Sequence, residues 1–307
     1  YTRPLPVIWK IMCEIDWTFF DRDFFKDLIS ALIGTGTALL IFYMTLRSDK
    51  KKSKEEEEQQ NQRRLNYLWN IVTATKNQAE SFIKNLEKSI ADFEKDNLNF
   101  HLLTKNPNSS LDRLNGLLNN ENYFLAYFKK FGKKNIKKFN NVSLQTDFFI
   151  EQEKQIWEMT KIAQSFDYNR KKSFTQTTND LMNRTAGLLK IDLLEQPYKD
   201  RINAIFEDYY QNVGDMTDLS FHYERFIRPT MTNVLIENVD KPEIIELISE
   251  FKNVSNLFNE IKMQNSNHNE SQKLILKHYK ESLEFFKRDA SELIDEEKEI
   301  DTETKTE

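Results

Sequence analysis

The stretch "LNYLWNIVTATKNQAESFIKNLEKSIADF", residues 65–93, decides the fold of this 307-residue chain. Residues in it recur at steps of seven in two parallel series, most of them apolar. The first series is Leu65, Val72, Ala79, Leu86 and Phe93, and the second is Leu68, Thr75, Phe82 and Ser89. Such a heptad register is typical of a helix that packs lengthwise in a coiled coil. Trp69, Ile83 and Ile90 widen the apolar face, so we expect more than one neighbouring helix.

Upstream lies "LISALIGTGTALLIFYMTL", residues 28–46, which contains no acidic, basic or histidine side chain. As a helix it would be roughly 28 Å long, close to the thickness of a bilayer core. A cleaved signal sequence would carry its positive charge before the apolar run, whereas here the basic residues between Arg47 and Lys54 follow it. A buried core helix is the other alternative. We expect a single membrane span with the following residues in the cytoplasm.

The remaining segments are assigned from the same patterns. Residues 1–23 are rich in aromatic and charged side chains, which predicts an amphipathic segment either in the membrane interface or packed on a neighbouring subunit. The predicted organisation is an interfacial segment (1–23), a transmembrane helix (24–47), a long heptad helix (48–103), a cytoplasmic helical domain (104–297) and an acidic tail (298–307).

Composition predicts an all-α protein, because six glycines and six prolines are few for this length. We expect one helix from about Phe24 to about Phe100, a turn at Pro107, and a helix that is kinked or divided at Pro229. Further helices are predicted over residues 110–139, 143–166, 173–195, 197–212, 216–238, 241–264 and 270–297. The single cysteine, Cys13, excludes a disulfide within the chain and fits a reducing cytosol.

The sequence does not predict an enzyme. Its four histidines are too scattered to provide a pair of metal ligands at helical spacing, and its glycines form no phosphate-binding loop. Paired acidic residues such as Glu207 and Asp208 are expected to be solvated. We therefore expect no catalytic residue, no metal and no cofactor.

One basic cluster stands out in "YFKKFGKKNIKKF", residues 127–139, which contains no acidic residue. Its lysines are Lys129, Lys130, Lys133, Lys134, Lys137 and Lys138. On a helix they would share adjacent turns, with Phe128, Phe131 and Phe139 between them, which favours phosphate contacts and base stacking on a single-stranded nucleic acid. The alternatives are a basic helix on the bilayer surface and a solvated face.

A stripe of small residues marks the apolar run. Ser30, Gly34 and Ala38 fall at steps of four, and Thr37 lies seven residues after Ser30. Small side chains allow helices to approach closely in an oligomer, and hydroxyls are also able to face a water-filled pathway. The alternative is that such residues are merely tolerated in a monomeric anchor.

The order of segments resembles that of bacterial anti-phage membrane effectors of the abortive-infection type, including the channel effector of the Hailong system. The resemblance covers the span "LISALIGTGTALLIFYMTL", the long helix "RRLNYLWNIVTATKNQAESFIKNLEKSIADF" and the helical domain, and it assigns no functional residue. It implies an effector in the bacterial inner membrane that is held shut by a short single-stranded DNA or a nucleotide ligand. A partner nucleotidyltransferase encoded with it would make that ligand.

These expectations lead to two main hypotheses of function. The first is an oligomeric channel that is gated by its cytoplasmic helical domain and depolarises the membrane. The second is a membrane-tethered scaffold or sensor that recruits a partner through its coiled coil and passes no ions. A membrane-bound nuclease is a third possibility, disfavoured by the lack of a catalytic constellation.

Overall fold

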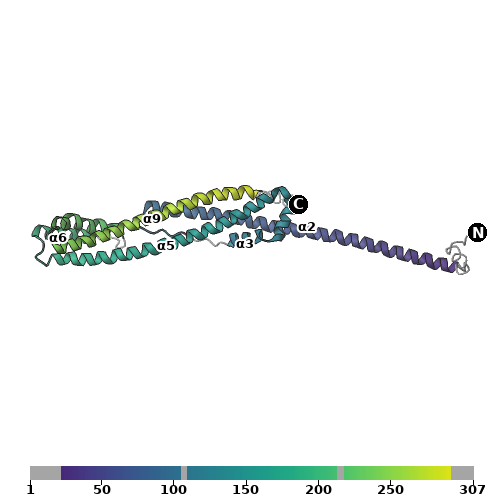
Figure 1. The fold of residues 1–307 in the computed structure, drawn as a ribbon, viewed down its shortest axis with the longest axis horizontal. Coiled ribbons are helices and arrows are strands. Elements are labelled where there is room, and N and C mark those ends of the chain that lie inside the picture. The colour runs from purple at the N-terminus through teal and green to yellow at the C-terminus, as the bar shows by residue number, and fades with distance from the viewer. Residues whose placement is uncertain (1–21, 105–108, 213–217, 292–307) are drawn as a thin grey trace, which may run out of the picture. The chain divides into compact units, whose positions relative to one another are not determined.

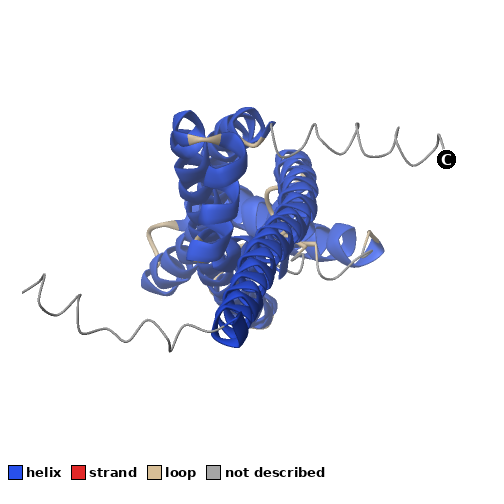
Figure 2. Cartoon of the chain, turned by 90° about the vertical axis from the view of Figure 1, so that its right-hand side faces the viewer, coloured by secondary structure: helices blue, strands red, loops and turns tan. Residues whose placement is uncertain are grey.

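The computed structural model describes residues 22–104, 109–212 and 218–291. Nearly all of the predicted interfacial segment, with Cys13, and the whole acidic tail lie outside these ranges. Within them every regular element is helical and no strand occurs, which confirms the all-α class (Figure 2). The chain divides into two compact units, residues 1–64 and 65–307.

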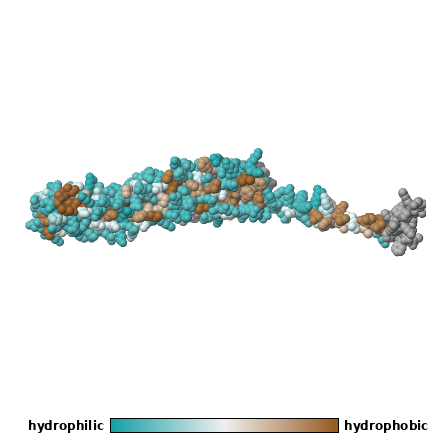
Figure 3. Space-filling model, in the orientation of Figure 1, coloured by the Kyte–Doolittle hydropathy of each residue, from teal (hydrophilic) through white to brown (hydrophobic). Residues whose placement is uncertain are grey.

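The long N-terminal helix is α2 (Arg22–Lys95). It contains the apolar run, and every residue from 28 to 46 is exposed in the described chain (brown side chains at the right of Figure 3). The helix ends at Lys95, a few residues before the predicted end near Phe100. The reason is Asp96, whose Oδ1 accepts hydrogen bonds from the backbone N–H groups of Leu98 (2.9 Å) and Asn99 (3.3 Å) and so forms a turn.

The second unit holds the remaining elements in addition to the end of α2 (Figure 1). They are α3 (Ser109–Leu118), α4 (Glu121–Phe131), the 3-10 turn η2 (Lys133–Asn135), α5 (Ile136–Leu188), α6 (Gln196–Gln211), α7 (Leu219–His222), the π-helical turn η3 (Tyr223–Ile227), α8 (Arg228–Thr230), the π-helical turn η4 (Met231–Leu235), the 3-10 turn η5 (Ile236–Asn238) and α9 (Pro242–Asp289). Pro229 lies in α8 between the two π-helical turns, and residues 219–238 are helical throughout, so the hydrogen-bond pattern changes around the proline without ending the helix.

Helices α5 and α9 run side by side in opposite directions along the unit (Figure 1). The predicted divisions of these segments, at about 166–173 and 264–270, are wrong, because both helices continue through them. Polar residues at or beside the predicted divisions lie in the interior: Asp167, Asn265 and His268 are all buried. Burial of one helix face overrides the weak helix propensity of asparagine and aspartate.

A seven-residue repeat runs through all three long helices. All nine residues of the two series in 65–93 are buried. In α9 a series of buried positions alternates at steps of three and four from Ile244 to Asp289, and in α5 every seventh residue from Phe139 to Leu188 is buried. In α5 and α9 the middle of the repeat is polar, and an apolar core lies on each side of it.

Three ion pairs join α2 to α9 at steps of seven residues. Glu80 pairs with Lys287 (3.0 Å), Glu87 with Lys280 (2.5 Å) and Glu94 with Lys273 (2.9 Å). As the α2 number rises by seven the α9 number falls by seven, which makes the two segments antiparallel. Phe82 against Tyr279 and Ser89 against Gln272 follow the same spacing in the interior.

Candidate functional site

The small-residue stripe lies on α2 as predicted by its spacing. Ser30, Gly34, Thr37 and Ala38 are all exposed, and a methyl group placed on Gly34 would meet nothing within 4 Å. The Thr37 hydroxyl donates to the carbonyl oxygen of Ile33 at 2.8 Å, so its own helix already satisfies it. The polarity of Thr37 therefore does not require a water-filled pathway. Small size, which permits close helix packing, is the stronger argument for this face.

The basic cluster occupies a corner and not a single helix. The helix predicted over 110–139 is interrupted at residues 119–120 and again at Gly132. Gly132 has a φ of 76°, a conformation that favours glycine, and it separates α4 from η2 and α5. Two lysines therefore lie in the last turn of α4, two in η2 and two in the first turn of α5; they are Lys129 and Lys130, Lys133 and Lys134, and Lys137 and Lys138.

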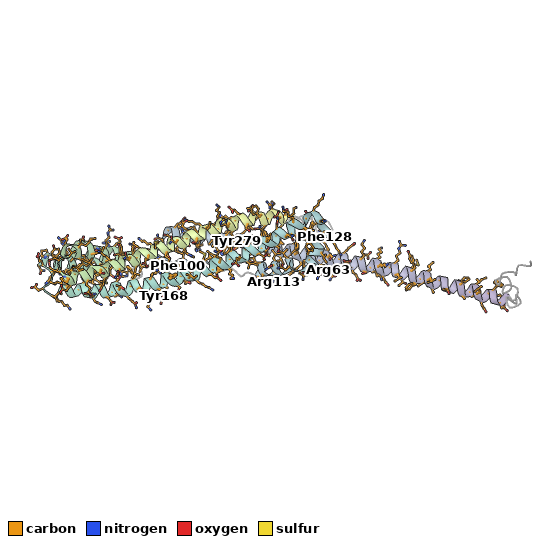
Figure 4. All side chains as sticks on the ribbon, in the orientation of Figure 1. Arg63, Phe100, Arg113, Phe128, Tyr168 and Tyr279 are labelled. Carbon is orange, nitrogen blue, oxygen red and sulfur yellow. The ribbon has the colours of Figure 1, made fainter. Side chains whose placement is uncertain are left out.

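The phenylalanines between these lysines belong mostly to the core. Phe139 is 4% exposed and contacts Tyr127 with ring centroids 5.0 Å apart, and Phe131 is partly buried against the same tyrosine. Only Phe128, labelled in Figure 4, is exposed among the three. Of the three phenylalanines that we expected to stack on bases, only Phe128 is therefore accessible. The other two are packed in the apolar interior.

The lysines differ in their surroundings. The Lys130 ammonium lies over the Trp69 ring, 4.5 Å from its centroid, in a cation–π contact. Lys138 lies near Asp289, whose pKa is lowered first by the Arg288 hydrogen bond and also by this lysine. Lys133, Lys134 and Lys137 are exposed and form no ion pair with the described residues. These three are the lysines best placed to contact a polyanion.

Across the described ranges, histidine, cysteine and acidic side chains form no group of three or more that would hold a metal ion. His222 and Tyr209 are buried, and the Tyr209 hydroxyl lies 2.7 Å from His222 Nδ1. This pair fills the core under α6 and α7.

Sequence reasoning missed a buried polar layer between the two apolar cores. Gln272 lies at its centre, because its side-chain nitrogen contacts His268 Nε2 at 3.0 Å and its side-chain oxygen accepts from the Ser89 hydroxyl at 3.2 Å. Burial lowers the pKa of His268 from 6.5 to about 4, so the ring is neutral at neutral pH and its Nε2 accepts the bond from Gln272.

The same layer connects α9 to α5 and to the chain after α2. The Asn265 side-chain amide donates to Asp167 Oδ1 and to the backbone oxygen of Asn97, both at 3.0 Å. Asp167 also pairs with Lys171 at 2.8 Å. The sequence contained a signal for this layer, because Asn265, His268 and Gln272 continue the three–four spacing of the apolar residues on both sides.

No protein-family model, no curated protein and no solved structure matches this chain. Its function has to be inferred from its own side chains and their arrangement.

Proposed function

We propose that this chain is a single-span membrane effector that assembles with copies of itself into an ion pore controlled by residues 65–307. The observation that carries the proposal is the apolar run of α2. It is the one stretch in the described residues that is long and apolar enough to cross a membrane, and none of it is buried. A helical segment of about 19 exposed, mostly apolar residues is costly in water and is typical of contact with lipid.

The orientation and location follow from charge. The basic residues between Arg47 and Lys54 lie directly after the span, which favours a cytoplasmic side for everything beyond them. On this orientation residues 65–307 would lie in the cytoplasm, and the bacterial inner membrane as the location is taken from the architectural resemblance. The setting in anti-phage defence, and a partner enzyme that makes a nucleic-acid ligand, come from the architectural resemblance alone.

Self-assembly is supported by the stripe of Ser30, Gly34, Thr37 and Ala38. Helices associate in lipid through close packing of small residues, because no hydrophobic driving force acts between them there. A lone helix does not enclose a path for ions, so pore activity requires several copies.

Control by the cytoplasmic unit is supported by α2 itself, because the apolar run and the heptads belong to one helix. The ion pairs at steps of seven and the matching interior contacts are typical of an antiparallel coiled coil, which we propose between residues 65–95 and α9. A change in this packing would be passed directly to the span. The corner defined by Lys133, Lys134 and Lys137 is the proposed contact for a short single-stranded nucleic acid.

The test combines particle mass with conductance. Purified full-length protein in detergent is expected to be a homo-oligomer and to conduct ions in planar bilayers. Gly34→Leu should disturb assembly or narrow the pathway and so reduce ion flux, whereas the control Leu32→Ile should do little. A monomeric particle, or the lack of conductance with and without single-stranded DNA, would favour the membrane-tethered scaffold.

A further inference from the structure

A cavity of about 630 Å³ lies between the segment that follows α2 and the middle of α5, with Leu219 at one edge. This volume is within the range of small-molecule sites. Phe100 and Tyr168, both labelled in Figure 4, lie on its two sides, and Lys171 and Lys172 line it from α5. It is separate from the basic corner, whose lysines do not line it.

The segment that forms one wall is held in place by its own hydrogen bonds. The Asp96 carboxylate accepts from the backbone of Leu98 and Asn99 and from the Asn99 side chain at 2.7 Å, and His101 Nε2 lies 2.9 Å from the Asp96 backbone oxygen. Desolvation would raise the pKa of Asp96, but these hydrogen bonds outweigh it and hold that pKa below its usual value. This wall is therefore built before any ligand arrives.

The aromatic part of this wall, Phe100, contacts the buried polar layer. Phe100 stacks on the His268 ring with centroids 5.6 Å apart and meets Phe93 edge-on at 5.5 Å. On the opposite side Asp167 is 7% exposed and holds the Lys171 ammonium at 2.8 Å. Because Asn265 bonds both Asp167 and Asn97, the two walls are linked through α9.

The side chains that line the cavity fall into three chemical kinds. Tyr168 is 65% exposed and offers a ring face. The amides of Asn99, Gln164 and Gln176 offer both donors and acceptors, as the edge of a heterocycle requires. The charge of Lys171 is neutralised by its ion pair with Asp167. The charge of Lys172 remains, so the lining carries one net positive charge.

We infer that this cavity binds a mononucleotide, with the base beside Tyr168 and Phe100 and the phosphate at Lys172. Stacking of the base on an aromatic ring would strengthen binding without selecting one base. Such a ligand would touch both α5 and the residues that directly follow α2. The inference does not depend on pore activity, because a scaffold without a pore would bind the same ligand.

Calorimetric titration of the full-length protein in detergent tests this site, with AMP, GMP, CMP and UMP as probes. At least one is expected to bind, and its nucleoside and ribose 5-phosphate are each expected to bind about tenfold more weakly or worse. Lys172→Glu and Tyr168→Ala should each weaken binding by about tenfold or more. Both side chains are exposed, so neither change should disturb folding.

The matched control is Lys133→Glu with Lys134→Glu in the basic corner, which should leave mononucleotide affinity unchanged. The inference is overturned if none of the four nucleotides binds at millimolar concentration, or if both cavity variants bind with wild-type affinity. It is also overturned if the control variant loses binding, since the site would then be the basic corner. The inference is likewise overturned if the nucleoside or ribose 5-phosphate binds as tightly as the nucleotide.

Discussion

His268 is a buried histidine that the surrounding side chains keep neutral. Because burial lowers its pKa to about 4 in the folded protein, against 6.5 when exposed, the unfolded chain takes up a proton first as the pH falls. Stability is unaffected above pH 6.5 and should fall by about 1.4 kcal/mol per pH unit between 6.5 and about 4. The full loss attributable to this residue is roughly 3 kcal/mol.

His268→Gln retains a hydrogen-bonding side chain and removes the titration. Denaturant unfolding at neutral pH and at about pH 4.5 should therefore show a smaller difference in the variant than in the wild type. An equal difference in both proteins would mean that His268 is not the responsible group.

Gly132 is a second residue whose effect is local and specific. An alanine there would meet no neighbouring atom within 4 Å, so its cost arises only from the backbone, with φ at 76°. Gly132→Ala should lower the free energy of unfolding by about 1–3 kcal/mol. Gly116→Ala, inside α3 and equally free of contacts, should raise it by up to about 1 kcal/mol. Thermal unfolding of the two variants compares them, and equal shifts would contradict the backbone argument.

At single residues, what the sequence could predict was periodicity and charge. Leu65, Phe82 and Phe93 were assigned to the interior by spacing alone, and all are buried. Whether Phe139 is buried or exposed depends on its packing against Tyr127 and the core, and no local sequence pattern reveals that packing. The Thr37 hydroxyl was equally ambiguous, because its bond to Ile33 competes with any contact to water.

At the scale of elements, the ion pairs between α2 and α9 test the register of the two helices. Glu87 and Lys280 are each about half-exposed, so the pair itself contributes less than about 1 kcal/mol. Glu87→Lys should lower the free energy of unfolding by about 1 kcal/mol, because repulsion replaces attraction. Lys280→Glu in the same chain should restore most of this loss, as measured in a double-mutant cycle. Additive losses would argue against direct pairing.

The corner between α4 and α5 carries a prediction about polyanions. If Lys133, Lys134 and Lys137 contribute to about four phosphate contacts, the log–log salt slope for single-stranded DNA should be near −3. Replacing all three with glutamate should abolish binding measured by fluorescence anisotropy. The matched control replaces Lys161, Lys252 and Lys277, which lie outside the corner, with glutamate. This variant should retain most of the DNA binding. Unchanged affinity of the corner variant would remove this contact from the proposed function.

Helix boundaries were harder to predict than helix existence. The predicted helices 241–264 and 270–297 left a gap around a run of asparagine and serine, residues with weak helix propensity. In the structure Asn265 is held by Asp167 and Asn97, and Gln272 is held by His268 and Ser89. Several of these partners lie more than 90 residues away in the sequence. Tertiary contacts, and not local sequence, therefore explain why α9 continues through this region.

At the scale of the molecule, the two units differ in how they bury apolar surface. Residues 65–307 enclose two apolar cores of their own. The run 28–46, by contrast, exposes Leu32 and Leu39 by 63% each in the single chain. Burying side chains of this kind is worth about 1.5–3 kcal/mol each. The apolar run of the first unit is therefore uncovered in the single chain, whereas much of the apolar surface of the second unit is packed in its own cores.

This contrast leads to a prediction about solubility. A fragment of residues 65–307 should be soluble without detergent and helical by circular dichroism, and should unfold cooperatively, because its cores are complete. The full-length chain should sediment with membranes and require detergent. Changing Leu32, Leu39 and Leu40 together to glutamine should release it from membranes in part, since polar groups in hydrocarbon are costly. A full-length protein that stays soluble and discrete without detergent would show that the run is covered by protein, and the pore would have to be abandoned.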